Sequence, residues 1–434
     1  MKKRVSRVAA CALLALPGIG IGGVTDKTLG VTGLEQQVVE WRRYFHQFPE
    51  LSNREFRTSD KVAAELQKMG LTVRTGIAHT GVVAVLKGGK PGPLVALRSD
   101  MDGLPVVEQV DLPFKSVQKG RYRGREVGVM HACGHDMHMA ILLGTARALT
   151  AARDQLAGSV MFIFQPAEEG APDGEEGGAE LMLKEGLFAE AKPAAIFGLH
   201  VFSTAAAGMV GYRSGPAMAA QDKFTIRIKG RQTHGSRPWD GVDPIVVAAQ
   251  IITAAQTIES RQVDVTKAPS ILSFGIVQGG VRNNIIPDEV ELIGTIRNFD
   301  MGIRESIHTR LRRTAVNIAE ASGASAEVFI DEGYPVTVND PALTEAMLPT
   351  VRRVAGDERV FEAPLVTGAE DFSYYAREVP GFFLYLGITP ADVSLSDAAS
   401  NHSPLFFADE SALMTGVGLL TNLAIDYMTL NPVD

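Results

Sequence analysis

Hydrophobic residues follow two different periods along the first half of the chain. In some segments they recur every three or four positions, as in an amphipathic helix, and in others they form short apolar runs, as in a buried strand. The predicted helices cover residues 34–46, 54–69 and 139–149, and the predicted strands cover residues 71–73, 81–86, 94–99, 159–165 and 194–200. The glycines and prolines of residues 88–93 predict a turn between two of these strands. Strands that alternate with helices predict an α/β domain whose sheet is covered on both faces.

The pattern changes near Gln221, where apolar and polar residues begin to alternate, as in half-exposed strands. The predicted order is strand 223–229, helix 243–261, strands 270–277 and 289–297, helix 304–322 and strand 326–331. This β-α-β-β-α-β order is typical of a ferredoxin-like α+β module. From Pro341 the α/β pattern returns, and it ends in a helix over residues 411–430. We therefore predict one α/β domain in two segments, 32–217 and 333–434, with a smaller module inserted at 218–332.

Length, composition and charge narrow the class of protein. The 434 residues suggest more than one structural unit, and 45% hydrophobic with 21% charged residues is ordinary for a soluble globular protein. The formal net charge of −8 lacks the basic surface expected of a nucleic-acid-binding protein. We therefore expect no nucleic acid partner.

Residues 1–24 have the pattern of a secretory signal peptide. Lys2, Lys3, Arg4 and Arg7 precede an apolar run that Pro17 and several glycines interrupt. The run is too interrupted for a good membrane-spanning helix, which needs about 20 apolar residues. We expect a bacterial periplasmic or secreted protein with no membrane contact after signal removal.

The segment 130–138, M-H-A-C-G-H-D-M-H, holds three of the nine histidines of the chain and one of its two cysteines. Cys11, the other cysteine, lies in the predicted signal peptide, so the mature chain has a lone thiol that cannot form an internal disulfide. Cys133 and His135 flank Gly134, whose flexibility lets both side chains converge on one ion. Because thiolate and imidazole are preferred ligands of transition metals, the segment predicts a metal site.

Further candidate residues follow the predicted strands. Glu168 and Glu169 lie in a loop, where one carboxylate can bind a metal while the other accepts a proton from water. His200 ends a predicted strand, and His402 lies in a polar turn. Asp102 follows another strand and is suited to orient a ligand histidine. Each of these residues in isolation is more typical of a solvated loop or a structural position than of a functional site.

Taken together, these stretches resemble the M20 metallopeptidases, in the amidohydrolase branch with hippurate hydrolases, N-acyl amino acid amidohydrolases and auxin-conjugate hydrolases. The matching stretches are RRYFHQFPELS (42–52), RSDMDGLP (98–105), HACGHD (131–136), QPAEEG (165–170), GLH (198–200), HGSRP (234–238), NIIPD (284–288), GAEDFS (368–373) and NHSP (401–404). They occur in the family's order and cover the chain from about residue 34 to its end. Each stretch is weak alone, whereas the ordered set is specific.

The resemblance implies a metal-dependent amidohydrolase with two divalent ions per subunit, zinc, manganese or cobalt. The implied ligands are Cys133, His135, Glu169, His200 and His402. Glu168 is implied as the general base and later proton donor, and Asp102 as the carboxylate that orients a ligand. Other branches of the family have His-x-Asp where this chain has Asp100-Met101-Asp102, so the role of Asp100 stays open. His131 and His138 do not carry over as ligands, and we expect them to form local hydrogen bonds.

The inserted module resembles the family's dimerisation, or lid, domain, which implies a homodimer or higher homo-oligomer. His234 corresponds to the histidine that reaches the neighbouring subunit's site and stabilises the oxyanion, and Asn284 and Arg297 to residues that bind the polar end of the substrate. The implied reaction is hydrolysis of the amide bond of N-acyl amino acids or similar small conjugates. One alternative is a dipeptidase or carboxypeptidase with the same machinery. The other is a scaffold that has lost catalysis, which the retention of Glu168 beside all five ligands disfavours.

Overall fold

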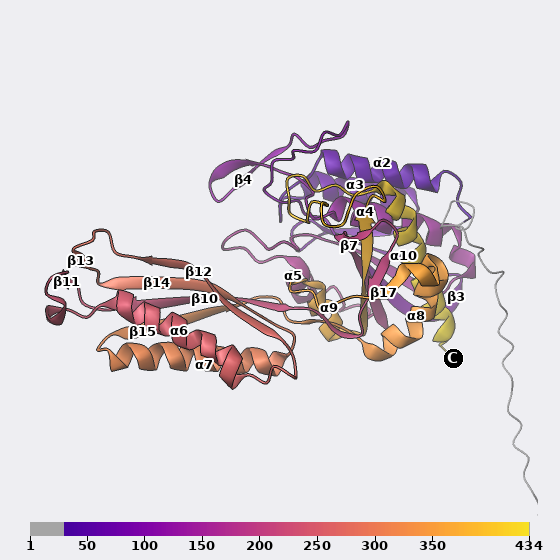
Figure 1. Ribbon diagram of the computed structural model, residues 1–434. Helices are drawn as coiled ribbons and strands as arrows, with labels where there is room; N and C mark the ends of the chain where they lie inside the picture. The colour runs from indigo at the N-terminus through magenta and orange to yellow at the C-terminus, as the bar shows by residue number, and fades with distance from the viewer. Residues whose placement is uncertain (1–29, 434) are drawn as a thin grey trace, which may run out of the picture.

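The computed structural model describes residues 30–433, and the chain forms a larger and a smaller domain (Figure 1). The smaller domain is built from residues 220–332, and the larger domain contains the chain before and after it. The predicted signal peptide lies outside the described residues, so it stays a prediction.

The larger domain is organised around a mixed eight-stranded sheet. In spatial order its strands are β1 (Thr72–Ile77), β2 (Gly81–Lys87), β6 (Ala157–Gln165), β3 (Lys90–Asp100), β7 (Ala195–Ala206), β18 (Gly381–Thr389), β8 (Val210–Tyr212) and β17 (Val360–Glu362). The four central strands β6, β3, β7 and β18 are parallel to one another. Their carboxyl ends therefore lie at one edge of the sheet, where ligand sites of α/β proteins gather.

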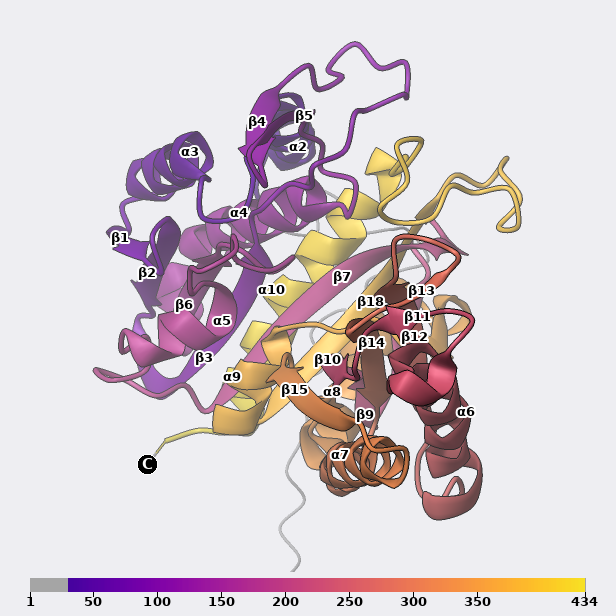
Figure 2. The ribbon, with the colours of Figure 1, turned by 90° about the vertical axis from the view of Figure 1, so that its left-hand side faces the viewer.

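Helices cover both faces of this sheet (Figure 2). On one face lie α2 (Leu34–Gln47), α3 (Phe56–Lys68), α4 (His135–Ala151), α8 (Pro341–Ala355) and α10 (Leu413–Leu430), and on the other α5 (Gly178–Lys184) and α9 (Phe372–Glu378). Successive residues of β6 alternate between the two cores: Phe162 packs on the first face, and Met161 and Ile163 pack on the second. The predicted α/β class with a doubly covered sheet is confirmed.

Within the described chain, one helical segment, Glu410–Leu430, is long and apolar enough to cross a membrane. It includes α10, which packs against α4 and α8 in the core of the larger domain, and most of it is buried there. Its apolar composition is therefore explained by burial inside the protein.

The smaller domain has the predicted ferredoxin-like order. Its antiparallel strands, in spatial order, are β12 (Ser270–Gly279), β14 (Glu289–Asn298), β10 (Ala220–Lys229) and β15 (Ser325–Glu332), and its helices are α6 (Pro244–Gln262) and α7 (Met301–Ala321). Alternate residues of β10, including Phe224 and Ile226, are buried with the inner faces of both helices. The alternation seen in the sequence thus reflects a sheet covered by helices on one side.

Short strand pairs complete the fold. They are β4 (Lys119–Tyr122) with β5 (Arg125–Gly128), β9 (Gly215–Met218) with β16 (Thr337–Asn339), and β11 (Thr233–His234) with β13 (Ile285–Ile286). The β9–β16 pair joins the chain entering the smaller domain to the chain leaving it. Two paired segments of the chain therefore connect the domains.

Two local predictions from the sequence are wrong. Residues 90–93 belong to β3 and do not form a turn, because Lys90 pairs with Ala157 of β6. At Gly92 the backbones of β3 and β6 approach so closely that a Cβ would collide with the Ala157 carbonyl. His200 does not end its strand either. Strand β7 continues to Ala206 beside β18, so His200 lies in the middle of a long strand.

Candidate active site

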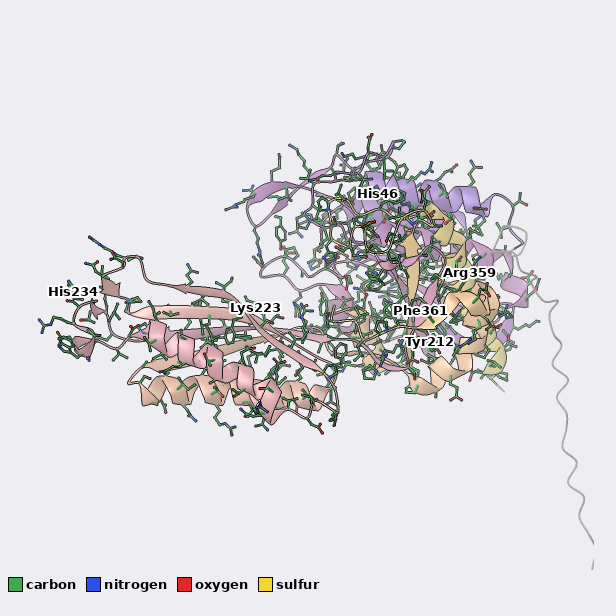
Figure 3. All side chains as sticks on the ribbon, in the orientation of Figure 1. His46, Tyr212, Lys223, His234, Arg359 and Phe361 are labelled. Carbon is green, nitrogen blue, oxygen red and sulfur yellow. The ribbon has the colours of Figure 1, made fainter. Side chains whose placement is uncertain are left out.

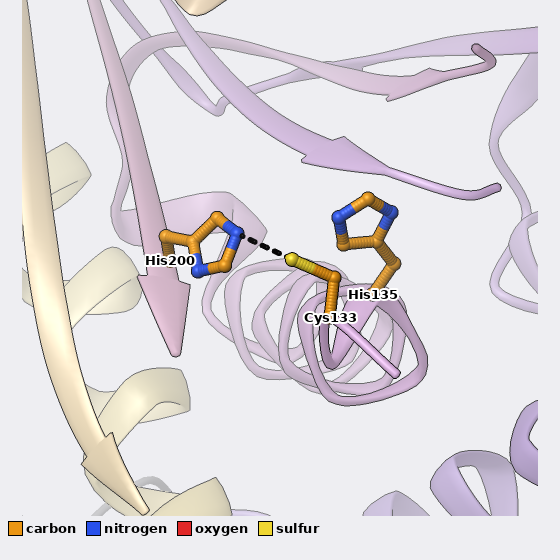
Figure 4. Close-up of side chains that lie close together, drawn as sticks. All are labelled: Cys133, His135 and His200. Carbon is orange, nitrogen blue, oxygen red and sulfur yellow. Dashed lines mark hydrogen bonds between the residues drawn. The ribbon is translucent and has the colours of Figure 1, made fainter. Parts of the chain in front are cut away.

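Cys133 and His135 stand at the amino end of α4, on the turn that the sequence predicts. Gly134 between them has φ 91°, and a Cβ there would collide with Val201, so the turn requires glycine. Both side chains are buried and face His200 on the neighbouring strand β7 (Figure 4). The tight turn therefore places a thiol and an imidazole side by side against the sheet.

His200 presents one ring nitrogen to the thiol. Its Nδ1 lies 2.8 Å from the backbone carbonyl of Val201 and donates a hydrogen bond to it. Its Nε2 therefore carries the lone pair, and it lies 3.3 Å from Cys133 Sγ. Burial, followed by the nearby His138, holds the pKa of His200 well below its usual value, so the ring is neutral. A neutral imidazole with its tautomer fixed in this way is a prepared metal ligand.

His402 and Glu169 approach the thiol from the other side. His402 Nε2 lies 3.2 Å from Cys133 Sγ and 3.1 Å from Glu169 Oε1. His402 has φ 72°, a left-handed backbone conformation that a non-glycine residue adopts at a cost in strain. The thiol thus belongs to two ligand sets, one with His135 and His200 and one with Glu169 and His402.

The environment of His135 fits a bound cation. Its Nδ1 lies 3.3 Å from Asp102 Oδ1, and both of its buried ring nitrogens lack a hydrogen-bond partner in the described part of the chain. The Nε2 atom faces Glu168 Oε2 at 3.8 Å and Glu169 Oε1 at 4.0 Å. Burial opposes protonation of the ring, but Asp100 and Asp102 raise its pKa to about 10. An orphaned imidazole nitrogen among carboxylates in a buried site is the donor set that a divalent metal neutralises.

Asp102 contacts both the ligand histidine and the loop that carries the two glutamates. One carboxylate oxygen accepts the backbone N–H of Glu168 at 3.1 Å, and the other accepts that of Glu169 at 3.0 Å and the Ser52 hydroxyl at 2.8 Å. Burial acts against ionisation, but the His135 ring and these donors hold the pKa of Asp102 below its usual value. Asp102 is therefore a charged carboxylate fixed between the ligands of the site.

Glu168 lies deeper in the same loop, where other acidic groups surround it. Burial, together with Glu370, Glu169 and Asp371, raises its pKa well above the usual value. Arg98 compensates part of this charge through contacts of 2.8–2.9 Å to Asp100, Glu370 and Asp371. A carboxyl group with a raised pKa is suited both to accept and to return a proton.

Asp100, whose role the sequence left open, lies beside a candidate ligand, with its Oδ1 3.8 Å from His135 Nδ1. It pairs with Arg98 and accepts a 2.6 Å hydrogen bond from His138 Nδ1. His138 Nε2 in turn accepts the backbone N–H of Val201, so both of its ring nitrogens are occupied and the expected local hydrogen-bonding role is confirmed.

The prediction that His131 forms local hydrogen bonds is wrong. Both of its ring nitrogens are buried without a hydrogen-bond partner within residues 30–433. Burial lowers its pKa to about 4.

A cavity of about 480 Å³ adjoins the ligand sets. Cys133, Glu168 and His200 form its floor, and apolar walls come from Phe202, Met218 and Val366. Arg297, on β14 of the smaller domain, also lines the cavity, so the structure brings this predicted substrate-binding residue to the predicted metal ligands. Burial lowers its pKa, which means that its charge is only partly solvated and favours an anionic partner.

The structure places His234 and Asn284 elsewhere. They lie side by side, because His234 pairs with Ile285 and the N–H of Gly235 donates to the Asn284 carbonyl at 2.8 Å. Both are exposed, and Figure 3 shows His234 at the end of the smaller domain that points away from the larger domain. Within one chain, neither residue lines the cavity beside the metal ligands.

Tyr334 is a site residue that the sequence alone did not single out. It follows β15 at the point where the chain leaves the smaller domain, and it lines the cavity. Its hydroxyl donates a 2.6 Å hydrogen bond to the backbone carbonyl of Glu168. The loop that carries Glu168 is also constrained from the other side, since Ala167 has φ 53° and its N–H donates to Glu55. Tyr334 thus ties the Glu168 loop to the domain connection.

Replacing Tyr334 with phenylalanine is expected to lower kcat by about five- to tenfold, because one hydrogen bond worth about 1 kcal/mol would no longer hold the Glu168 loop. KM and metal content should change less than twofold, on the order of experimental scatter, because the ring still fills the cavity wall. Tyr374→Phe is the matched control, since the Tyr374 ring contacts that of Tyr334 but its hydroxyl makes no hydrogen bond in the described structure. Equal kinetics for wild type and Tyr334→Phe would show that the contact does not position Glu168.

The fold and this cluster define a metal-binding α/β hydrolase with an inserted second domain. The chain belongs to peptidase family M20/M25/M40, whose pattern matches residues 96–426. It is similar to thermostable carboxypeptidase 1 of Saccharolobus solfataricus, at 39% identity over 92% of this chain and 97% of that protein. It is also similar to N-acetyl-L-cysteine deacetylase of Bacillus subtilis, at 37% identity over 89% and 87% of the two chains.

Among solved structures, YxeP of Bacillus subtilis, described as a dinuclear metal binding peptidase of the M20 family, aligns with a TM-score of 0.76. The two chains share 34% identity over 92% of this chain and 99% of that one. The protein is therefore a metal-dependent hydrolase of amide or peptide bonds that uses divalent metal ions.

Proposed function

We propose that the protein hydrolyses the amide bond of N-acyl amino acids or similar small conjugates, with two divalent ions held by each subunit. The observation that carries this proposal is the pair of ligand sets that share Cys133, one with His135 and His200 and one with Glu169 and His402. Two ions held by sets with a common ligand would lie close together, as two-metal hydrolases require, at about 3.5–4 Å. Thiolate and imidazole favour zinc, and the carboxylate also tolerates manganese or cobalt.

The side chains around the ligand sets are suited to move one proton. Divalent ions bound there supply Lewis-acid activation of a water molecule and of the scissile carbonyl. Glu168 accepts the proton of the attacking water and returns it to the leaving nitrogen, and the raised pKa of its carboxyl group favours holding that proton between the two transfers. Asp102 orients His135 and fixes the backbone of Glu168, so the base and a ligand stay in register.

The cavity supports a small substrate with one anionic end. Its volume of about 480 Å³ is that of a site for a small molecule and not for a folded protein. Arg297 is placed to bind the carboxylate of the amino acid, while the apolar wall accepts its side chain. One relative is named a deacetylase of N-acetyl-L-cysteine, which supports an N-acyl amino acid as the substrate here.

A carboxypeptidase activity is the second candidate. The relative at 39% identity is named a thermostable carboxypeptidase, and Arg297 would bind the terminal carboxylate of a peptide as readily as that of an N-acyl amino acid. The two activities share the metal site and Glu168. They differ only in whether the group on the acyl side is a simple acyl group or an aminoacyl or peptidyl group.

We also propose that the protein works as a homodimer or higher homo-oligomer through its smaller domain. His234 and Asn284 lie at the far end of that domain, out of reach of their own metal ligands (Figure 3). Strand β12 is an edge of the smaller sheet and exposes Ile271, Ile276 and Val277, and an unpaired apolar edge strand favours pairing with a second chain. A partner so placed would bring His234 over the neighbouring site, where its imidazole can stabilise an oxyanion.

A substrate panel with the remetallated protein tests the proposal. We expect N-acetyl and longer N-acyl amino acids to be hydrolysed with kcat/KM at least about tenfold above dipeptides and C-terminally blocked peptides, a difference of about 1.4 kcal/mol. The physical reason is that a free amine at the acyl side would place a positive charge beside the metal ions. Faster hydrolysis of dipeptides or longer peptides would replace the amidohydrolase proposal with the exopeptidase.

A further inference from the structure

A second cavity, of about 400 Å³, is lined by Glu169, one of the candidate metal ligands. Glu169 and Gly170 line both cavities, so the loop that carries a candidate ligand separates them. Another wall is formed by Gly103 and Leu104, which directly follow Asp102 in the chain. The second cavity therefore borders the candidate site at the Glu169 loop.

The lining of the second cavity is partly apolar and partly basic. Leu51, Leu104 and Pro105 provide apolar surface. The hairpin of β4 and β5 adds Arg121, Tyr122 and Arg123, and Arg54 completes the basic side.

The three arginines differ in whether a carboxylate already neutralises them. Arg54 Nη2 lies 2.5 Å from Glu175 Oε1, and Arg123 Nε lies 3.2 Å from Asp173 Oδ2. The Arg121 side chain makes no ion pair or hydrogen bond in the part of the chain that the structure describes, and it is exposed to the cavity it lines. One positive charge of the second cavity is therefore left for a ligand.

A substrate with its scissile carbonyl at the metal ligands has an amino acid arm and an acyl arm. On the proposed function, on which this inference rests, Arg297 in the first cavity binds the carboxylate of the amino acid arm. The acyl arm then extends into the second cavity. We infer that this cavity is the acyl-group site and that Arg121 selects acyl chains that end in a carboxylate, such as a glutaryl group. The apolar walls contact the methylene chain, and the guanidinium binds the distal carboxylate as a charge-assisted pair.

Ligand binding tests the inference without depending on turnover. Glutarate and valerate have the same chain length, and each offers one carboxylate to the remetallated wild-type protein, but only glutarate offers a second. We expect glutarate to bind at least about tenfold more tightly than valerate, in line with the strength of a charge-assisted contact. Arg121→Ala should remove this advantage and leave valerate binding unchanged. Arg125→Ala is the matched control, because Arg125 is an exposed arginine of the same hairpin that does not line the cavity.

Hydrolysis of N-glutaryl and N-valeryl derivatives of one amino acid gives the second readout. Wild type and Arg125→Ala should prefer the glutaryl substrate, and Arg121→Ala should lower kcat/KM at least about tenfold for that substrate alone. Equal binding of the two acids by wild type, or a glutarate advantage that survives Arg121→Ala, would overturn the inference. Hydrolysis of the valeryl substrate with no effect of Arg121 would overturn it and leave the proposed function standing. Hydrolysis of neither substrate would overturn both.

Discussion

Replacing Glu168 with glutamine is expected to reduce kcat by at least about a hundredfold, the usual minimum loss when a general base is removed. The two side chains are nearly isosteric, and the Glu168 backbone N–H and carbonyl would keep their contacts with Asp102 and Tyr334. The variant should therefore retain its bound metal and bind substrate with little change. Steady-state kinetics together with metal analysis of the same sample measures both effects.

Two further variants separate proton transfer from metal binding. Glu169→Gln should lose bound metal as well as activity, because Glu169 belongs to a ligand set with Cys133 and His402. Glu176→Gln, which alters an exposed carboxylate paired with Lys184 in the same segment, should resemble wild type. If Glu168→Gln keeps its activity to within about tenfold, a smaller loss than removal of a general base normally causes, another group transfers the proton.

His234→Ala is expected to be nearly as inactive as Glu168→Gln, yet an equimolar mixture of the two variants should recover activity. If His234 acts on the partner's site, each homodimer lacks one group at every site. In a heterodimer one site carries both defects, and the other has Glu168 and His234 intact. Random pairing in a two-fold dimer makes about half of the dimers mixed, so about a quarter of all sites should regain activity.

The control for this mixing experiment is the extent of subunit exchange, measured by native mass spectrometry on the same samples. A second control mixes Glu168→Gln with Glu169→Gln. Each of these substitutions disables the site of the subunit that carries it, so every site of their heterodimer stays defective and no activity should return. If heterodimers form and activity does not return, His234 acts within its own subunit or has no part in catalysis. In that event its exposed position at the end of the smaller domain requires another explanation.

The sequence was a good guide to the fold wherever its hydrophobic pattern was clean. The alternation in β10 and the helical spacing in α2 both predicted the observed elements, because each element buries one regular face. The pattern failed where the backbone was determined by contacts distant in sequence. Residues 90–93 look like a turn, yet the chain stays extended because Gly92 packs directly on Ala157 of the adjacent strand.

The site shows the same division. Cys133 was predicted as a ligand from local sequence, because thiol and imidazole residues at close spacing are visible there, whereas Glu169 was predicted as a ligand through the family resemblance. Arg98 and Tyr334 were not assigned roles, because their partners lie far along the chain: Arg98 contacts Glu370, and the Tyr334 hydroxyl contacts Glu168. Polar contacts between residues far apart in the chain leave no periodic pattern in the sequence. The free charge of Arg121 likewise becomes visible only when the pairs of its neighbours are known.

The central claim is that Cys133 and the ligands around it form a two-ion centre. Metal analysis of the remetallated protein is the most direct test of this claim. At neutral pH we expect about two equivalents of divalent metal per chain, as two-metal hydrolase sites require. The metal should dissociate as the pH falls, because histidine binds metal only when neutral and protonates near pH 6.5 when free. Cys133→Ser should lower the content below two, since both ligand sets include Cys133. About two equivalents that dissociate in acid is the predicted result, and a content near zero in folded wild-type protein would contradict the account.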